Sequence, residues 1–392
     1  MREVATGQGS SASAAAHRIR RILVDGRPLQ GDSAARGIGS YLSGLLEGVA
    51  GIGFAPQVAL LLARGVAAPR MARDLGLRAV AAVPRLERRA QVLADPLLVG
   101  TALRHTQSRL YHAVEYGQPW RSPVPVVVTV HDLIPFLLPG YSWRSRLLRR
   151  PGLRLLPRAD AVITPSQATA DDCIRIGGVP PERIQVIPHG LAGSFRPATP
   201  EAVEDIRRRF RLPRPYLLGV GTFEPRKGLQ HLVAVTRRLR RAHDLDLVVA
   251  GSQGIFAPAV RAQLAALGQH GRDLGFVPAS DLATLYSGAA AFVFPSAYEG
   301  FGLPLLEAMG CGTVAVTFAN SALPEVAGGA AVLVPDGDQA ALGDAVWALL
   351  DNPDEAERRR RLGIQVAASF SWRKAALQTV EVYQRVLGER LI

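Results

Sequence analysis

The first half of the chain alternates short apolar runs with longer segments whose apolar residues recur at helical spacing. The runs are rich in β-branched residues, and several end at Gly or Asp: RILVDG at 21, PQVALLL at 56, RLYHAV at 109, VPVVVTVHD at 124, ADAVITPS at 159 and IQVIPHG at 184. Runs that are apolar throughout are typical of parallel strands that helices cover on both faces. This half therefore predicts an α/β domain with a parallel sheet.

The same pattern restarts after a Pro- and Arg-rich join at residues 192–214. The second series of runs is PYLLGVGT at 215, LDLVVAG at 245, DLGFV at 273, AAFVFPS at 290, GTVAVT at 312 and AVLVPDG at 331. Two Rossmann-like domains in tandem explain the repeat, and we place them at residues 18–195 and 196–369. The helical segment 370–392 is expected to pack across the join, back on the first domain. Residues 1–17 are small and polar and predict a disordered leader.

The amino-acid composition indicates which kinds of partner the chain favours. The chain has 392 residues, of which 46 are Lys or Arg and 33 are Asp or Glu, so its formal charge is +13. Such a charge favours nucleic acid, anionic lipid or a phosphorylated small molecule as partner. Aromatic residues make up only 6% and no nucleic-acid-binding motif is evident, so we expect no nucleic acid. An Arg-rich proteome would give the same charge with no partner at all.

Two further features concern the compartment. Cys173 and Cys311 lie far apart, without the spacing of a zinc site or a disulfide framework, which fits a reducing cytosol. No apolar run approaches the roughly 18 residues of a membrane span. We therefore predict a cytoplasmic protein.

The stretch SAYEGFGLPLLEAMGCGTVAV, residues 296–316, carries the first candidate chemistry. It follows a predicted strand, so Glu299 is expected on a loop and Glu307 about one turn inside a helix that begins near Leu303 or Pro304. The backbone of Gly300, Phe301 and Gly302 can approach a ligand closely, and the first helical amides can donate to a phosphate. Glu307 could bind the hydroxyls of a ribose, and Glu299 those of the group attached to the phosphate.

A basic pair supplies the second candidate chemistry. In YLLGVGTFEPRKGLQHLV, Gly219 and Gly221 end a predicted strand, and Arg226 and Lys227 precede a helix. Two cations at such a place suit a diphosphate whose charge grows as it leaves, although a solvated helix start would look the same in isolation. Together with the two glutamates, the pair predicts a site for a nucleotide-diphosphate sugar.

These stretches resemble the motifs of retaining glycosyltransferases of the GT-B fold, family 4. The segment from Glu299 to Glu307 is similar to the glutamate, seven-residue, glutamate motif, and EPRKGL to the diphosphate-binding pair. SALPEVAGGAAVLVPDGD at 321 resembles the segment after that motif, and GIGSYLSGLL at 37 the glycine loop and first helix. TVHDLIPFLLP at 129 resembles the His-Asp segment of the mannosyltransferase-like branch.

The resemblance implies two facing Rossmann-like domains with a cleft between them, and a role for each matching residue. His131 would contact and orient the donor sugar, and the backbone at Gly37 and Gly39 would approach the donor phosphates. Asp132 is expected to cap the next turn. The implied catalytic residues are His131, Glu299, Arg226 and Lys227, and the implied donor-binding residues are Gly37, Gly39, Gly221, Gly300, Phe301, Gly302, Leu303 and Glu307.

The implied reaction is transfer of a hexosyl group with retention of anomeric configuration. GDP-mannose is the favoured donor, and the acceptor is a hydroxyl of a glycan, glycolipid or glycoside. We expect no metal and no cofactor, because the basic pair supplies positive charge. One alternative is a UDP-, ADP- or dTDP-sugar-dependent transferase acting on a natural product. A nucleotide-sugar epimerase, a sugar phosphorylase and a non-enzymatic anionic-surface binder are the alternatives of other classes.

A basic segment at residues 141–160 stays open to two interpretations. Six arginines alternate there with Trp143 and five leucines, and Pro151 and Gly152 are expected to divide the segment into two short pieces. It is either an ordinary solvated surface helix or a surface that attracts an anionic acceptor or lipid headgroups. The second interpretation places the protein peripherally at the inner face of a membrane.

Overall fold

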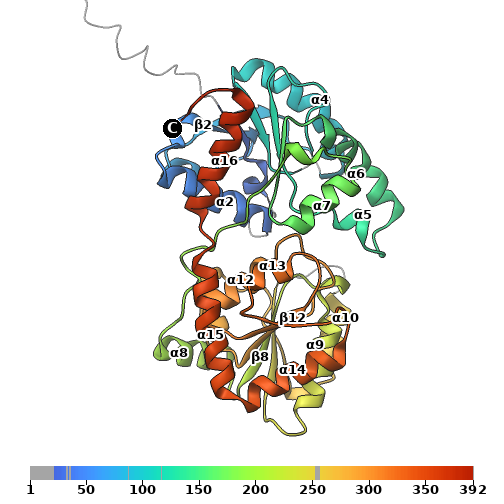
Figure 1. Cartoon of the computed structure of the whole chain (residues 1–392), viewed down its shortest axis with the longest axis vertical. Coiled ribbons are helices and arrows are strands. Elements are labelled where there is room, and N and C mark those ends of the chain that lie inside the picture. The colour runs from blue at the N-terminus through green and yellow to red at the C-terminus, as the bar shows by residue number, and fades with distance from the viewer. Residues whose placement is uncertain are drawn as a thin grey trace, which may run out of the picture.

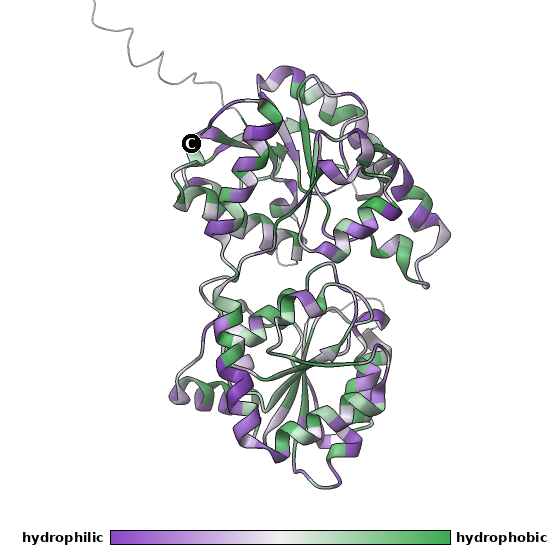
Figure 2. Cartoon of the chain, viewed as in Figure 1, coloured by the Kyte–Doolittle hydropathy of each residue, from purple (hydrophilic) through white to green (hydrophobic). Residues whose placement is uncertain are grey.

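Two parallel sheets, each covered by helices, form the chain (Figure 1). The computed structural model describes residues 22–391 except 32–33, 35–36, 87, 116 and 252–256. The expected leader at 1–17 lies outside the described residues. Apolar strands occupy the middle of both domains, and polar positions gather on the outer helices (Figure 2). The predicted α/β class with two Rossmann-like domains is confirmed.

Within the described residues, the first domain has a seven-stranded sheet in which every pairing is parallel. In spatial order the strands are β3 (Arg78–Val83), β2 (Val58–Ala63), β1 (Ile22–Asp25), β4 (Leu110–Ala113), β5 (Val126–Thr129), β6 (Ala161–Thr164) and β7 (Ile184–Val186). The helices are α2 (Gly37–Gly51), α3 (Arg70–Asp74), α4 (Arg88–Thr106), α5 (Ile134–Leu137), α6 (Trp143–Leu155) and α7 (Gln167–Arg175).

In the part of the second domain that the structure describes, six strands form a parallel sheet. Its strands in spatial order are β10 (Gly271–Asp273), β9 (Asp246–Ala250), β8 (Tyr216–Val220), β11 (Ala291–Phe294), β12 (Ala315–Phe318) and β13 (Val332–Val334). Its helices are α8 (Pro200–Phe210), α9 (Leu229–Leu239), α10 (Ala257–Ala265), α11 (Ala279–Ser287), α12 (Leu303–Gly310), α13 (Leu323–Ala327), α14 (Gln339–Asp351) and α15 (Pro353–Ala368). Strands β9, β11 and β12 are buried along their whole length, as uniformly apolar runs predict.

The chain crosses between the domains twice, and the two crossings touch. The amide of Leu191 donates to the carbonyl oxygen of Phe370 at 3.0 Å. After the second crossing, α16 (Trp372–Leu387) packs on α2 of the first domain, as Figure 1 shows. A Cβ on Gly44 would come within 2.1 Å of the Trp372 indole, and one on Gly190 within 2.1 Å of the Trp372 backbone nitrogen. Trp372 therefore packs so closely that neither position has room for a side chain.

Two local predictions are wrong, and the predicted join holds a helix. DLGFV at 273 is mostly a turn, because the Asp273 carboxylate accepts from the Gly275 amide at 2.8 Å and ends β10 at that residue. The predicted join contains α8, whose first turn is capped by the Thr199 hydroxyl. Helix α6 runs unbroken through Pro151. Pro151 has no amide hydrogen, so the carbonyl of Leu147 lacks its helical hydrogen bond. Leu147 is exposed, and water can donate to this carbonyl instead.

Candidate active site

The carboxyl ends of the two sheets meet at Gly300. His131 follows β5, Ser166 follows β6, and Gly300 lies in the loop after β11. The Gly300 carbonyl accepts from Ser166 Oγ at 2.7 Å and from Thr169 Oγ1 at 3.1 Å. A Cβ on Gly300 would lie 1.8 Å from the His131 carbonyl oxygen, so only glycine fits this contact. The domains are thus in direct contact beside the predicted site residues.

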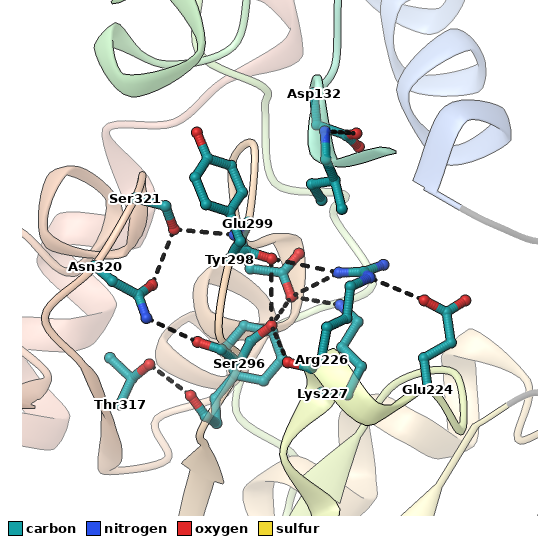
Figure 3. Close-up of polar contacts among 12 residues, drawn as sticks. Asp132, Glu224, Arg226, Lys227, Ser296, Tyr298, Glu299, Thr317, Asn320 and Ser321 are labelled. Atoms are coloured by element: carbon teal, nitrogen blue, oxygen red, sulfur yellow. Dashed lines mark hydrogen bonds and ion pairs between the residues drawn. The ribbon is translucent and has the colours of Figure 1, made fainter. Parts of the chain in front are cut away.

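Glu299 is the centre of a polar network in the second domain (Figure 3). Its Oε1 lies 2.5 Å from Lys227 Nζ, accepts from Ser296 Oγ at 2.6 Å and lies 3.5 Å from Arg226 Nη1. Ser321 Oγ accepts from the Glu299 amide at 2.9 Å. Burial opposes ionisation of this carboxyl, but Lys227 and Arg226 outweigh it and hold its pKa below the usual value. Glu299 is therefore an ionised, rigidly oriented carboxylate.

The two predicted cations sit on a single helical turn, Pro225–Lys227, that precedes α9. The turn is fixed against the loop that follows β11, because the Ala297 amide donates to the Arg226 carbonyl at 2.8 Å. Gly228 follows with φ +69°, and a Cβ there would come within 2.1 Å of the Pro295 carbonyl oxygen. Arg226 Nε also donates to Glu224 Oε2 at 2.9 Å. Backbone contacts thus place both cations beside the acid loop, which is residues 295–302 and carries Glu299.

The pairing of Lys227 with Glu299 bears on how a ligand could enter. The predicted roles require Lys227 to hold a diphosphate and Glu299 to hold sugar hydroxyls, whereas here each holds the other. The pocket beside them, lined by Gly221, Lys227, Phe294 and other residues, has a volume of about 10 Å³, which is room for about one water. A nucleotide sugar would have to separate the pair and displace neighbouring groups.

Glu307 occupies the first turns of α12, which begins at Leu303 as predicted. Gly302 precedes this helix with φ +100°, a backbone angle that favours glycine. Tyr286 Oη donates to Glu307 Oε2 at 3.2 Å. Burial raises the pKa of Glu307 to about 7, and the tyrosine bond offsets only part of this effect. Its carboxyl is half ionised near neutral pH.

His131 is a neutral ring on the first domain. Burial lowers its pKa to about 4, and its Nε2 donates to the Val114 carbonyl at 3.0 Å. The ring packs edge-on against Tyr41, with centroids 4.6 Å apart, and 5.5 Å from the ring of His189. On the side of the second domain, the ring of Phe301, from the acid loop, lies with its centroid 4.7 Å from that of His189. An aromatic cluster therefore spans the domain contact.

The predicted glycine loop is helical. Gly37 and Gly39 form the first turn of α2, with Gly37 exposed and Gly39 buried, while positions 32–33 and 35–36 before them lie outside the described residues. One turn later, Tyr41 reaches His131 and shares a hydrogen bond of 3.0 Å with Thr129. Helix α2 thus brings Tyr41 to the aromatic cluster.

Sequence reasoning missed several polar residues at the domain contact. The Glu325 carboxylate, on α13, accepts from the Gln167 and Ala168 amides at 2.8 and 2.9 Å, at the N-terminus of α7. Tyr298 donates to Asp172 across the same contact. Glu325 lies in the quoted stretch at 321, yet bonds to backbone amides leave no sequence signal. Asp132 accepts from the Ile134 amide at 3.0 Å, as its predicted cap requires.

The residues that the structure describes contain no group of three or more His, Cys, Asp and Glu side chains arranged to hold a metal ion. None of their helices has the length and apolar character needed to span a membrane.

Two family descriptions match the chain. Residues 36–192 match "Glycosyltransferase Family 4" and residues 203–366 match "Glycosyl transferases group 1". The O-antigen chain mannosyltransferase B of Escherichia coli is 31% identical over 300 residues, which cover 74% of this chain and 78% of that protein. The MMP alpha-(1->4)-mannosyltransferase of Mycolicibacterium hassiacum is 31% identical over 67% of this chain and 66% of its own length.

Solved structures share the two-domain architecture. Sucrose-phosphate synthase from Thermosynechococcus elongatus superimposes with a TM-score of 0.78 at 22% identity, covering 94% of this chain and 99% of its own. HepE from Anabaena, in complex with UDP and glucose, has a TM-score of 0.74 at 18% identity and covers 94% of this chain and all of its own. At these identities the likeness establishes the fold, which is GT-B.

Proposed function

The chain belongs to glycosyltransferase family 4, and on this premise we propose that it transfers mannose from GDP-mannose, with retention of configuration, to a hydroxyl of a glycan, glycolipid or glycoside. The observation that carries the proposal is the fixed group of Arg226, Lys227 and Glu299 at the carboxyl end of the second sheet, directly beside His131 of the first. The mannosyltransferases among its relatives support the choice of sugar.

In this mechanism the basic pair stabilises the leaving group. As the bond between the sugar and the diphosphate breaks, negative charge grows on the phosphate oxygens. Cations held in place beforehand stabilise that charge without reorganising. Lys227 would turn from Glu299 to the diphosphate, and Glu299 would then accept hydrogen bonds from sugar hydroxyls. Glu307 would bind the ribose.

Retention is supported by the likeness of the Glu299-to-Glu307 motif to that of retaining transferases. The acceptor hydroxyl would attack from the face that the diphosphate leaves. Closure of the two domains would exclude water, which favours transfer to the acceptor over hydrolysis.

Other donors form the second candidate. HepE was solved with UDP and glucose, and starch synthase IV from Arabidopsis thaliana, of the same fold, with ADP and acarbose. These ligands make UDP- and ADP-sugars candidate donors as well. The base and sugar are contacted by loops outside the shared motifs, so the motifs do not select among these donors.

The test is a thermal-shift screen of GDP-, UDP-, ADP- and dTDP-sugars, followed by transfer assays and NMR of the product. GDP-mannose should raise the melting temperature most, and the new linkage should keep the α configuration of the donor. Incubation with donor alone identifies an epimerase, and inorganic phosphate with a glycan identifies a phosphorylase. Failure of every nucleotide sugar to stabilise the protein would overturn the proposal.

We also propose that the outer face of α6 contacts anionic membrane. Trp143 and Leu147 are 68% and 54% exposed, and the exposed Arg150 and Arg154 continue the same helical face. The helix contains no acidic residue. Just beyond it, Arg158 lies 5.9 Å from the ring of exposed Trp120. Tryptophan and arginine together suit a headgroup layer, where each cation contributes about 1 kcal/mol.

Sedimentation with vesicles of phosphatidylcholine, with and without phosphatidylglycerol, tests this contact. Wild type should bind only the anionic vesicles, and the triple variant Arg150→Gln, Arg154→Gln, Arg158→Gln should bind much less. A matched triple variant on α15, with Arg358, Arg360 and Arg361 changed to Gln, removes the same charge from the other domain and should bind as wild type does. Equal losses in both variants would leave only a nonspecific charge effect.

A further inference from the structure

Asp132 is a carboxylate with one oxygen anchored and the other available. It follows His131 at the end of β5, and its Oδ1 accepts from the Ile134 amide at 3.0 Å. Among the described residues, no hydrogen bond to Oδ2 is present. A Cβ on Gly300 would come within 3.0 Å of the Asp132 Cβ, so the residue lies directly against the acid loop of the second domain. Asp132 is thus oriented at the domain contact.

The groups that face Asp132 come from both domains. Arg226, Lys227, Glu299 and Tyr298 face it from the second domain and Tyr141 from the first. Figure 3 shows Asp132 across from Arg226, apart from the network of Glu299. Burial raises the pKa of Asp132, the Ile134 amide and Arg226 act against this, and the result is a pKa above the usual value.

We propose that Asp132 is a further catalytic residue, which accepts the hydrogen bond and then the proton of the attacking acceptor hydroxyl. The inference rests on the proposed function, since it requires a donor whose diphosphate is held by Arg226 and Lys227. A sugar attached to that diphosphate would lie between the cations and the first domain, within reach of Asp132 Oδ2.

The bond between the sugar C1 and the phosphate oxygen breaks, and its electron pair leaves with the diphosphate. The acceptor oxygen forms the new bond to C1, and its O–H bond breaks, with the proton passing to Asp132 Oδ2. The proton is released to solvent or to the diphosphate after the products separate.

Donor binding should strengthen this base. A diphosphate on Arg226 and Lys227 brings negative charge close to Asp132 and compensates the cations that now lower its pKa. A base whose pKa approaches the working pH is better suited to take a proton. A carboxylate here also repels an anionic group, so the accepting part of the substrate is a neutral hydroxylated unit, such as a sugar ring, rather than a phosphate.

Two variants separate catalysis from capping. Asp132→Asn keeps an oxygen for the Ile134 amide and loses the base, whereas Asp132→Ala loses both. With GDP-mannose and methyl α-D-mannopyranoside, kcat should fall about 10²- to 10⁴-fold in both variants, the range for loss of a general base. GDP affinity should stay within about twofold of wild type. Only the alanine variant should melt at a lower temperature.

Calorimetry gives a readout that needs no turnover. Titration of GDP into the protein at pH 6.5, in two buffers of different ionisation enthalpy, measures the net number of protons exchanged on binding. Asp132 takes up protons as it becomes more basic, which offsets the protons that Glu307 releases as its carboxylate binds the ribose. Asp132→Asn should therefore release more protons than wild type does. Wild-type turnover by Asp132→Asn, or the same net proton exchange in both proteins, would overturn the inference. Failure of wild type itself to bind GDP would instead count against the proposed donor.

Discussion

The two domains share one architecture but present the candidate site in opposite ways. The second domain offers a charge network, in which Glu299 is ionised and bound to Lys227. The first offers neutral rings, in which His131 packs on Tyr41 and is uncharged at neutral pH. In the proposed mechanism, fixed charge suits the half that would stabilise a departing diphosphate. Rings with few polar groups would suit the half that holds sugar surfaces.

The strongest test of this difference removes the central cation. Lys227→Ala leaves Glu299 as a buried carboxylate with only the more distant Arg226, and breaking a buried pair costs about 3–5 kcal/mol. Turnover should fall about 10²- to 10³-fold, as for loss of one preorganised charge-stabilising group. Chemical denaturation and steady-state kinetics measure the two effects.

The double variant Lys227→Ala, Glu299→Gln is the control. Removing both charges should recover most of the lost stability without recovering turnover, since the cation is still absent. Recovery of turnover would show that only folding requires Lys227.

The next test concerns Arg226, which is bound to Glu224 as well as to the acid loop. Arg226→Ala should lower kcat about 10²-fold while weakening nucleotide binding less, because its charge matters most as the diphosphate leaves. Arg237→Ala removes an exposed arginine from α9 of the same domain and should behave as wild type. Equal kinetics in the two variants would contradict the assignment of the pair.

The sequence predicts residues that lie in short local motifs, but it does not predict contacts between the domains. Arg226, Lys227, Glu299 and Glu307 lie in two short windows whose glycines and flanking strand patterns fix their places. The partners of Glu325 are backbone amides more than 150 residues earlier in the chain, so no local pattern identifies them. Asp132 is predictable as a cap, but its position opposite Arg226 depends on how the domains meet.

Strand prediction succeeded and failed for related reasons. Uniformly apolar runs identify β5, β9 and β11 because both faces of these strands are buried. Strand β3 is absent from the predicted runs, and most of its residues are exposed or half-buried at the sheet edge. An apolar run is a reliable signal only where helices cover both faces.

A third prediction separates stability from function at Glu307. Its folded-state pKa of about 7 lies above the usual 4.5, so the folded protein binds a proton more tightly than the unfolded chain does. The free energy of unfolding therefore falls as pH rises from about 4.5 to 7, by on the order of 1–3 kcal/mol. Glu307→Gln should match wild type at pH 5 and melt higher at pH 8.

The donor should respond to this variant in the opposite direction. A carboxylate that binds ribose hydroxyls contributes about 1.5–3 kcal/mol, so Glu307→Gln should weaken GDP binding about tenfold or more at pH 8. Wild-type affinity should rise with pH through about 7 as the carboxyl ionises. A pH-independent affinity in wild type would contradict the ribose role.

The smallest expected effect lies where the two halves meet. The Glu325 carboxylate of the second domain receives the first amides of α7 in the first domain, an interaction between a negative charge and a helix N-terminus. Glu325→Gln keeps hydrogen-bond acceptors but loses the charge, which is worth about 0.5–1 kcal/mol at a partly exposed site. The fraction of open molecules should rise about two- to fivefold, with a larger radius of gyration in solution scattering and faster proteolysis near residues 187–199.

Glu204→Gln, on exposed α8, removes an equal charge away from the contact and should change neither measurement. Saturating nucleotide sugar should reduce the difference between Glu325→Gln and wild type, because donor held by both domains favours closure independently of Glu325. If the variant scatters as wild type does without donor, the contact at α7 does not hold the domains together, and the two halves must be joined by other contacts, among them the crossings, the Gly300 contact and the bond between Tyr298 and Asp172.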